Sequence, residues 1–159
     1  MKSTYSTSHV RVTTRKSLAD VTKAFEAQLG RYDPAALESL SSTQTRSRLE
    51  GMQGKSGFML FGTFDHGALL TLFGQPRKAT QYVVGNPLFA MEMTRLKLGA
   101  GLYAPLRVLI SEESETTVVE CDLPSSLFSQ FRDAGVDAVA AMLDTKMEAL
   151  VAASVGANG

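Results

Sequence analysis

The chain has 159 residues, and because 16 are basic and 16 acidic its formal net charge at pH 7 is zero. This balance gives no general attraction to nucleic acid or to an anionic membrane, and we predict neither as a partner. The single cysteine excludes an intrachain disulfide framework and a cysteine-rich metal site.

The length predicts one domain over residues 1–159, large enough to bury a core. Residues 1–8 are polar, without the apolar run of a signal peptide, and no later run reaches membrane-spanning length. We therefore expect a cytoplasmic protein, with residues 1–8 and 156–159 frayed.

The N-terminal third predicts a strand followed by two helices. Residues 9–14 alternate and include four β-branched residues, Val10, Val12, Thr13 and Thr14, as in a half-buried strand. Ser17 with Asp20 predicts a helix cap, and Gly30 should end that helix. In residues 31–54, Asp33 and Pro34 predict a short helix, and the polar stretch after it predicts a loop.

Three apolar runs then predict an antiparallel meander. They cover residues 58–64, 68–73 and 78–84. The turns between them would be formed by Asp65-His66-Gly67 and by residues 74–76.

The segment around Asn86 and Pro87 predicts a sharp change from strand to helix. Asn86 is a strong N-cap residue and Pro87 suits the first helical position. We expect this helix to run until Gly99 and Gly101 break it. The junction is either simply a good cap or a site where free amide groups hold an anion.

The C-terminal part predicts a hairpin and then helices. Residues 106–110 and 117–121 would pair around the acidic turn 112–115, which brings the sheet to about six strands. Ser125 or Ser126 would cap a short helix and Asp133 a longer one. The longer helix carries an apolar stripe formed by Val136, Val139, Leu143, Met147 and Leu150.

Three runs carry a resemblance to a known family: residues 82–90 (YVVGNPLFA), 104–110 (APLRVLI) and 118–126 (VVECDLPSS). Together they resemble the family called domain of unknown function 302, over residues 58–150, whereas residues 1–55 depart from its pattern. The resemblance implies a TBP-like α+β fold, in which an antiparallel sheet has helices packed mainly on one face, often as a dimer. It implies no reaction.

Two residues are candidates for acid–base chemistry. His66 follows Asp65 and could exchange a proton near neutral pH, or it could lie exposed in a hairpin turn. Glu92 lies in an apolar segment and could act as a general acid or base if buried, or it could face solvent or pair with Arg95 or Lys97.

Other polar residues are candidates for ligand contacts. Arg107 could join the amide groups at Asn86 in clamping a carboxylate or phosphate, or its stem could cover the open sheet face. Tyr82 and Tyr103 could likewise contact a ligand or cover the sheet face. Asp122 could be a site carboxylate or could accept from nearby backbone amides.

The remaining chemistry-bearing residues predict no metal and no cofactor. Two histidines are too few for a histidine-rich zinc site, and no phosphate-binding glycine loop occurs. Cys121 lies in a predicted strand, and we expect it to be a small buried hydrophobic residue rather than a nucleophile.

Three functional hypotheses follow. The first is a small-molecule binding module, dimeric, whose apolar pocket lies between the sheet and the Asn86 helix and takes an apolar or carboxylate ligand. The second is a cofactor-independent isomerase, cyclase or lyase using His66 or Glu92. The third is a structural homodimeric interaction protein, with residues 136–151 as its seam.

Overall fold

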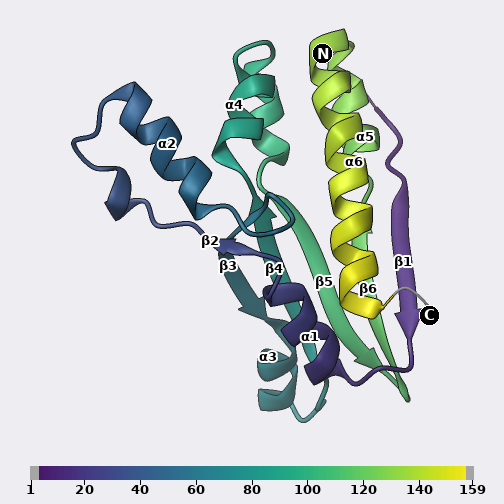
Figure 1. The fold of residues 1–159 in the computed structure, drawn as a ribbon. Coiled ribbons are helices and arrows are strands. Elements are labelled where there is room, and N and C mark those ends of the chain that lie inside the picture. Colours follow the sequence, from purple (N-terminus) through teal and green to yellow (C-terminus); the bar gives the residue numbers. More distant parts are fainter. Residues whose placement is uncertain (1–3, 157–159) are drawn as a thin grey trace.

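A single sheet of six strands organises the protein, whose computed structural model describes residues 4–156 (Figure 1). The strands are arranged in the order β1-β6-β5-β4-β3-β2, and β2 pairs in parallel with β3 while every other pair is antiparallel. Their bounds are β1 (His9–Thr14), β2 (Gly30–Arg31), β3 (Met59–Asp65), β4 (Ala79–Gly85), β5 (Leu106–Glu113) and β6 (Thr116–Asp122).

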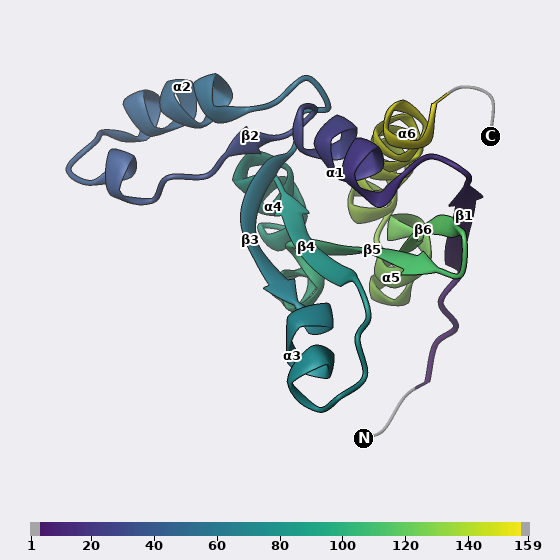
Figure 2. The same cartoon turned by 90° about the horizontal axis from the view of Figure 1, so that it is seen from below.

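Helices cover one face of this sheet. Figure 2 shows α1 and α6 together on one side of the strands and α3 on the other. The helices are α1 (Leu18–Glu26), α2 (Ser42–Met52), α3 (His66–Leu72), α4 (Pro87–Thr94), α5 (Pro124–Phe128) and α6 (Ala134–Val155), with 3-10 turns η1 (Ala35–Leu37), η2 (Leu98–Tyr103) and η3 (Ser129–Phe131). The α+β class and the mostly antiparallel sheet predicted above are confirmed.

The core lies between the sheet and α1 and α6. Because side chains alternate along a strand, Tyr82, Val108 and Val119 all point toward these helices. They meet Phe25 of α1 and the apolar stripe of α6, of which Val136, Leu143, Met147 and Leu150 are buried. This stripe is therefore occupied within the chain, so it does not provide the exposed homodimer seam of the third hypothesis.

The predicted helix starts are confirmed at three positions. The side chains of Ser17, Asn86 and Asp133 accept hydrogen bonds from backbone amides in the first turns of α1, α4 and α6. The prediction for α5 was wrong. That helix begins at Pro124, so Ser125 lies inside it and donates its amide hydrogen to Asp144 Oδ1 at 2.8 Å.

The prediction of a strand over residues 68–73 was wrong, because this segment belongs to α3. Asp65 caps it: its Oδ1 accepts from the amide of Ala68 at 2.8 Å, so Asp65-His66-Gly67 starts a helix rather than a hairpin turn. Alanine and leucine favour helix, and a short apolar run does not separate helix from strand by periodicity. The sixth strand is β2, which sequence reasoning missed.

Two further expectations are corrected. The polar stretch after residue 40 is not a loop, since Ser41 and Gln44 form a reciprocal capping box that begins α2. The Asn86 helix ends at Thr94, and Gly99 and Gly101 lie in η2.

The chain ends are described only in part. Fraying was predicted for residues 1–8 and 156–159, and of these residues 1–3 and 157–159 lie outside the described residues. Residues 4–8 have no regular structure, yet Tyr5 packs edge-on against Tyr103 with ring centroids 6.0 Å apart. Over residues 4–156, no helix has both the length and the apolar character needed to span a bilayer.

Candidate functional site

A cavity of about 210 Å³ lies where β4 ends, β5 begins and α4 starts. Its lining comes from β3, β4, β5, α4, α5 and α6, so residues far apart in the sequence meet there. The wall is chiefly apolar, and its aromatic members are Tyr32, Phe58, Phe61, Phe89 and Phe128. Tyr32 and Phe61 stack with their ring centroids 4.5 Å apart.

Small residues leave this space open. Gly85, Ala90 and Ala104 line it, three of the small positions around the central helix. A Cβ at Gly85 would lie 3.2 Å from Pro105 Cβ, closer than ordinary contact. Pro105 is exposed and also lines the cavity, so the cavity reaches the surface.

Asn86 is the polar side chain at the cavity that belongs to the capped helix, and both of its polar atoms are bonded. Its Oδ1 accepts from the amide of Leu88 at 2.9 Å, and its Nδ2 donates to the carbonyl oxygen of Gly57 at 2.8 Å. The residue is buried. Asn86 therefore ties α4 to the segment before β3 and has its hydrogen-bonding groups directed at the backbone.

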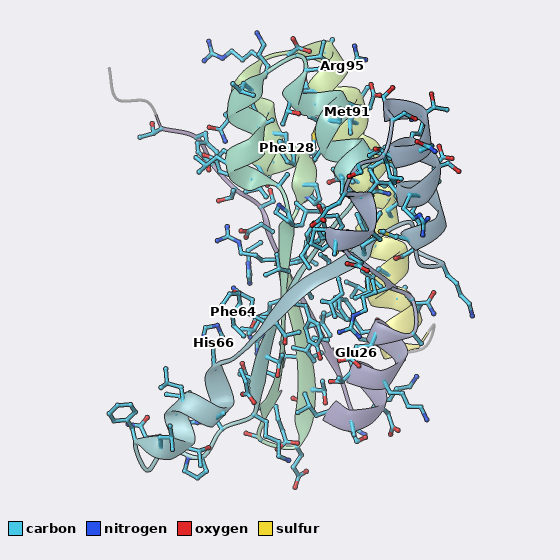
Figure 3. All side chains as sticks on the ribbon, turned by 90° about the vertical axis from the view of Figure 1, so that its left-hand side faces the viewer. Glu26, Phe64, His66, Met91, Arg95 and Phe128 are labelled. Carbon is cyan, nitrogen blue, oxygen red and sulfur yellow. The ribbon has the colours of Figure 1, made fainter. Side chains whose placement is uncertain are left out.

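The two acid–base candidates lie away from the cavity. His66 is exposed at the start of α3, and Phe61 lies five residues before it along β3, a separation of about 16 Å. Figure 3 shows His66 toward one end of the sheet and Met91 and Arg95 toward the other. Glu92 pairs with Arg95 on the surface of α4, its Oε2 2.7 Å from Arg95 Nη2. Neither of the two acid–base groups of the enzyme hypothesis therefore lines the cavity.

The other predicted ligand residues are dispersed. Arg107 is exposed between buried Leu106 and Val108, so it lies on the open face of the sheet. Arg107 does not line the cavity, and the clamp between Arg107 and the start of α4 stays a prediction.

The two tyrosines do not line the cavity. The hydroxyl of Tyr82 faces α1 and donates to Glu26 Oε1 at 2.9 Å, and burial first and this carboxylate second raise the pKa of Tyr82 to about 12. Tyr103 packs edge-on against Phe128, with centroids 6.3 Å apart. Tyr103 therefore contacts Phe128, a residue of the cavity wall, without lining the cavity itself.

Asp122 and Glu120 belong to a charged cluster that sequence reasoning did not assemble. His9 on β1 lies opposite Asp122 on β6, and its ring nitrogens lie 3.3 Å from Asp122 Oδ1 and 3.2 Å from Glu120 Oε1. Arg11 adds bonds to Glu120 at 3.0 Å and to Glu113 at 2.6 Å. Alternation along β1 was the available signal, but the pairing of β1 with β6 is a tertiary fact.

The contacts within this cluster shift the pKa values of His9 and Glu120. Hydrogen bonding to Glu120, and then to Asp122, raises the pKa of His9. Partial burial pushes the pKa of Glu120 upward, but hydrogen bonds from His9 and Arg11 outweigh it, so the pKa is lowered. The cluster lies on the exposed edge of the sheet and apart from the cavity.

A second hollow, of about 300 Å³, lies between β1 and α6. Cys121 lines it, and burial followed by the charge of Asp122 raises the pKa of this thiol to about 11. The expectation of a buried, unreactive cysteine agrees with this placement.

Lys146 is a residue near the cavity that sequence reasoning missed. It is half-buried one turn of α6 after Leu143, which lines the cavity. Its Nζ lies 5.4 Å from the ring centroid of Phe89, within cation–π range. No acidic side chain of residues 4–156 lies within 4.0 Å of it.

Comparison with known proteins identifies the family and gives no reaction. No curated protein matches the chain. A crystal structure described as an uncharacterized conserved protein DUF302 from Bacillus stearothermophilus is similar, with a TM-score of 0.66 and 16% sequence identity, covering 92% of this chain and 97% of that one. At this identity the likeness shows a shared fold. The departure from the family pattern expected over residues 1–55 is wrong for residues 35–55, since the family model for the domain of unknown function DUF302 matches residues 35–154. The chain therefore belongs to the DUF302 family.

Proposed function

We propose that this protein binds a small, mainly apolar molecule in the cavity between the sheet and α4. The observation that carries the proposal is the apolar space of about 210 Å³ at the start of α4. An engineered apolar cavity of about 150 Å³ binds benzene, so a single aromatic ring with a short substituent fits this volume.

The wall suggests which ligands would be favoured. Phe58, Phe61 and Phe89 present aromatic surface, which pairs well with an aromatic ring. Because the polar atoms of Asn86 are already bonded, burial of apolar surface would supply most of the binding free energy.

Lys146 favours a carboxylate on that ring. Its ammonium group lies beside Phe89 and has no acidic partner among the described residues. A carboxylate near Phe89 would gain a charge-assisted contact there. Benzoate and phenylacetate are therefore better probes than a neutral ring of the same size.

A thermal-shift and NMR titration tests the proposal with toluene, indole, benzoate and phenylacetate. A ligand at a hundredfold excess over its Kd adds about 2.7 kcal/mol of stability. For a domain of this size the melting temperature should then rise by roughly 5–10 °C.

Three variants test where and how the probes bind. Ala90→Leu places a larger side chain in the cavity and should abolish the shift, whereas Ala149→Leu, on the exposed side of α6, should leave it unchanged. Lys146→Met should weaken benzoate and leave toluene unaffected. If no probe stabilises the wild-type chain more than the Ala90→Leu variant, the proposal is wrong.

A further inference from the structure

We propose that β1 and the neighbouring face of α6 bind an extended peptide segment of another protein, which pairs with β1 as an added strand. This site, called the β1 groove below, consists of the free edge of β1 (His9–Thr14) and the hollow of about 300 Å³ between β1 and α6. Its lining residues and those of the cavity at α4 are different, so the inference is independent of the ligand proposed there.

β1 is an edge strand, and in residues 4–156 it has a strand on one side only. The sheet order begins with β1, whose neighbour is β6, and Figure 2 shows β1 at one end of the sheet. On the free side of an edge strand the backbone N–H and C=O groups are open for pairing with another chain.

The register with β6 identifies which backbone groups point outward. The amide of Leu123 donates to the carbonyl oxygen of Ser8 at 2.8 Å, so these two residues form a hydrogen-bonded pair. Such pairs alternate along an antiparallel ladder, which makes Val10 and Val12 the next bonded residues of β1. The backbone groups that point away from β6 therefore belong to the three exposed residues His9, Arg11 and Thr13.

The edge at β1 lacks features that usually protect a free strand. Folded proteins shorten such strands or interrupt them with a bulge or a proline. β1 has six residues, no proline and a register with β6 that runs without a shift. At the opposite edge, β2 has two residues, and β3 beside it has a register shift between Leu60 and Gly62. Of the two edges, β1 is therefore the one suited to accept another strand.

The charged side chains of β1 do not guard this edge. His9 bonds to Glu120 and Asp122 of β6, and Arg11 bonds to Glu120 and to Glu113 at the end of β5. Both side chains are thus directed toward β6, away from the free side of β1.

The hollow beside β1 would receive alternate side chains of the added strand. Val10 and Val12 of β1 line it and are half-buried, and its lining also includes the buried residues Cys121, Val151 and Val155. An added strand would bond to the outward groups of β1, so its residues opposite Val10 and Val12 would point to the same side as these valines. Two apolar side chains of the peptide would therefore enter the hollow.

The length of the β1 groove agrees with about six peptide residues. α6 contributes to its wall from Asp144 to Gly156, which is about 18 Å of helix. Figure 1 shows α6 running alongside β1. Because an extended residue spans about 3.3 Å, six of them cover β1 and this part of α6.

Two carboxylates of the β1 groove favour a basic residue in the peptide. Asp144 and Glu148 line the hollow one turn apart on α6, and neither has a basic side chain within 4.0 Å among residues 4–156. Asp144 lies at the start of β1: its Oδ1 accepts from the amide of Ser125, and the Oγ of Ser126 accepts from the amide of Ser8.

The direction of the peptide follows from these charges. In a strand antiparallel to β1 the C-terminal end lies at the start of β1, so the basic residue would follow the two apolar ones. At the other end of the groove Lys16 Nζ lies close to Gly156, which disfavours a basic residue there.

The open backbone groups and the hollow together favour a peptide of another protein as the occupant. In a second copy, Val10 and Val12 are already packed against the core of their own chain, so its β1 has no free apolar side chain for the hollow. Exposed apolar side chains elsewhere, such as Leu72 and Leu98, lie on helical turns and offer no strand edge.

An NMR titration with designed hexapeptides tests the inference. The probes have the sequence Thr-x-Thr-x-Thr-Lys with blocked ends, in which each x is Val, Ile, Leu or Phe. The amide signals of His9, Arg11 and Thr13 should shift, and at least one probe should bind with a dissociation constant below about 500 µM. A peptide of the same composition with its two apolar residues adjacent should bind about tenfold more weakly, because one of them would point away from the hollow.

N-methylation of the peptide separates strand addition from simple filling of the hollow. The threonine amides of the probe would point toward β1 and the amides of the x residues away from it. Methylation of the middle threonine nitrogen should weaken binding by about tenfold or more, whereas methylation of the second x nitrogen should change it by less than about twofold.

Variants of α6 locate the site. Ala152 is exposed and lines the hollow, so Ala152→Phe should weaken binding by about tenfold or more, whereas Ala149→Phe, at an exposed position outside the lining, should leave it unchanged. Glu148→Lys should weaken binding of the lysine probe by about fivefold and favour a probe with Glu in that place.

Three outcomes would overturn the inference. One is that no probe shifts the β1 signals up to 1 mM, and another is that both methylated peptides bind as tightly as the parent probe. The third is that the signals of His9, Arg11 and Thr13 change with protein concentration in the absence of peptide, which would assign the edge to a second copy. The peptide comparisons use the wild-type chain, so they decide the matter even if a variant fails to fold.

Discussion

Replacing Asn86 by alanine should destabilise the fold more than the loss of an ordinary helix cap. The side chain is 4% exposed and forms two bonds, one from the amide of Leu88 and one to the carbonyl of Gly57. The cap is worth about 1 kcal/mol. The carbonyl left without a donor adds about 1–3 kcal/mol.

The expected loss is therefore about 2–4 kcal/mol in the free energy of unfolding, or roughly 5–15 °C in melting temperature. Urea denaturation followed by circular dichroism measures it. Asn86→Asp separates the two bonds, because the carboxylate keeps the acceptor for Leu88 but lacks the donor for Gly57. We expect it to lose nearly as much stability as Asn86→Ala.

Ser17→Ala is the matched control. Ser17 caps α1 through a 3.1 Å bond from the amide of Asp20, but it is exposed and makes no second bond across the fold. Its loss should cost about 1 kcal/mol. If Asn86→Ala costs no more than Ser17→Ala, the tie between α4 and the segment before β3 has no energetic role and the reasoning is refuted.

Two further predictions concern titratable groups. The pKa of His9 is raised in the folded chain, so the stabilisation by its charged ring should be present below about pH 6.5 and be lost as pH rises through the folded value. His9→Gln should therefore reduce the free energy of unfolding at pH 5.5, by at most about 1 kcal/mol, and leave it unchanged at pH 8.5. Thermal denaturation at the two pH values measures this, and an equal effect at both would contradict it. Cys121, with a pKa of about 11, has roughly one thiolate in a thousand at pH 8, so iodoacetamide should label it only in urea; rapid labelling of the native chain would contradict its burial.

Much of the fold could be predicted because its signals are local. A cap such as Asn86-Pro87 or Asp133 acts within one turn, and the acidic turn between β5 and β6 acts between neighbouring strands. Such signals need no knowledge of distant residues. The class of fold and the family followed from them.

The α3 segment could not be predicted in the same way. Its run of leucines lacks the alternation of a strand and the polar face of an ordinary helix, so the period was ambiguous. The helix is decided by the cap at Asp65 and by the close approach of Gly67 to the chain at Arg77. The second of these depends on where β4 begins.

The candidate site also has a part that the sequence predicts and a part that only the tertiary structure decides. The sequence by itself determined that a capped helix follows a strand at Asn86 and that small and aromatic residues gather around it. Only the tertiary structure decided that Phe58 and Phe128 line the cavity beside that helix and that Lys146 lies over Phe89, whereas His66 and Arg107 do not line the cavity. The reason is physical: capping and turn formation depend on neighbours in the chain, whereas a cavity depends on which distant side chains fail to fill the space between packed elements.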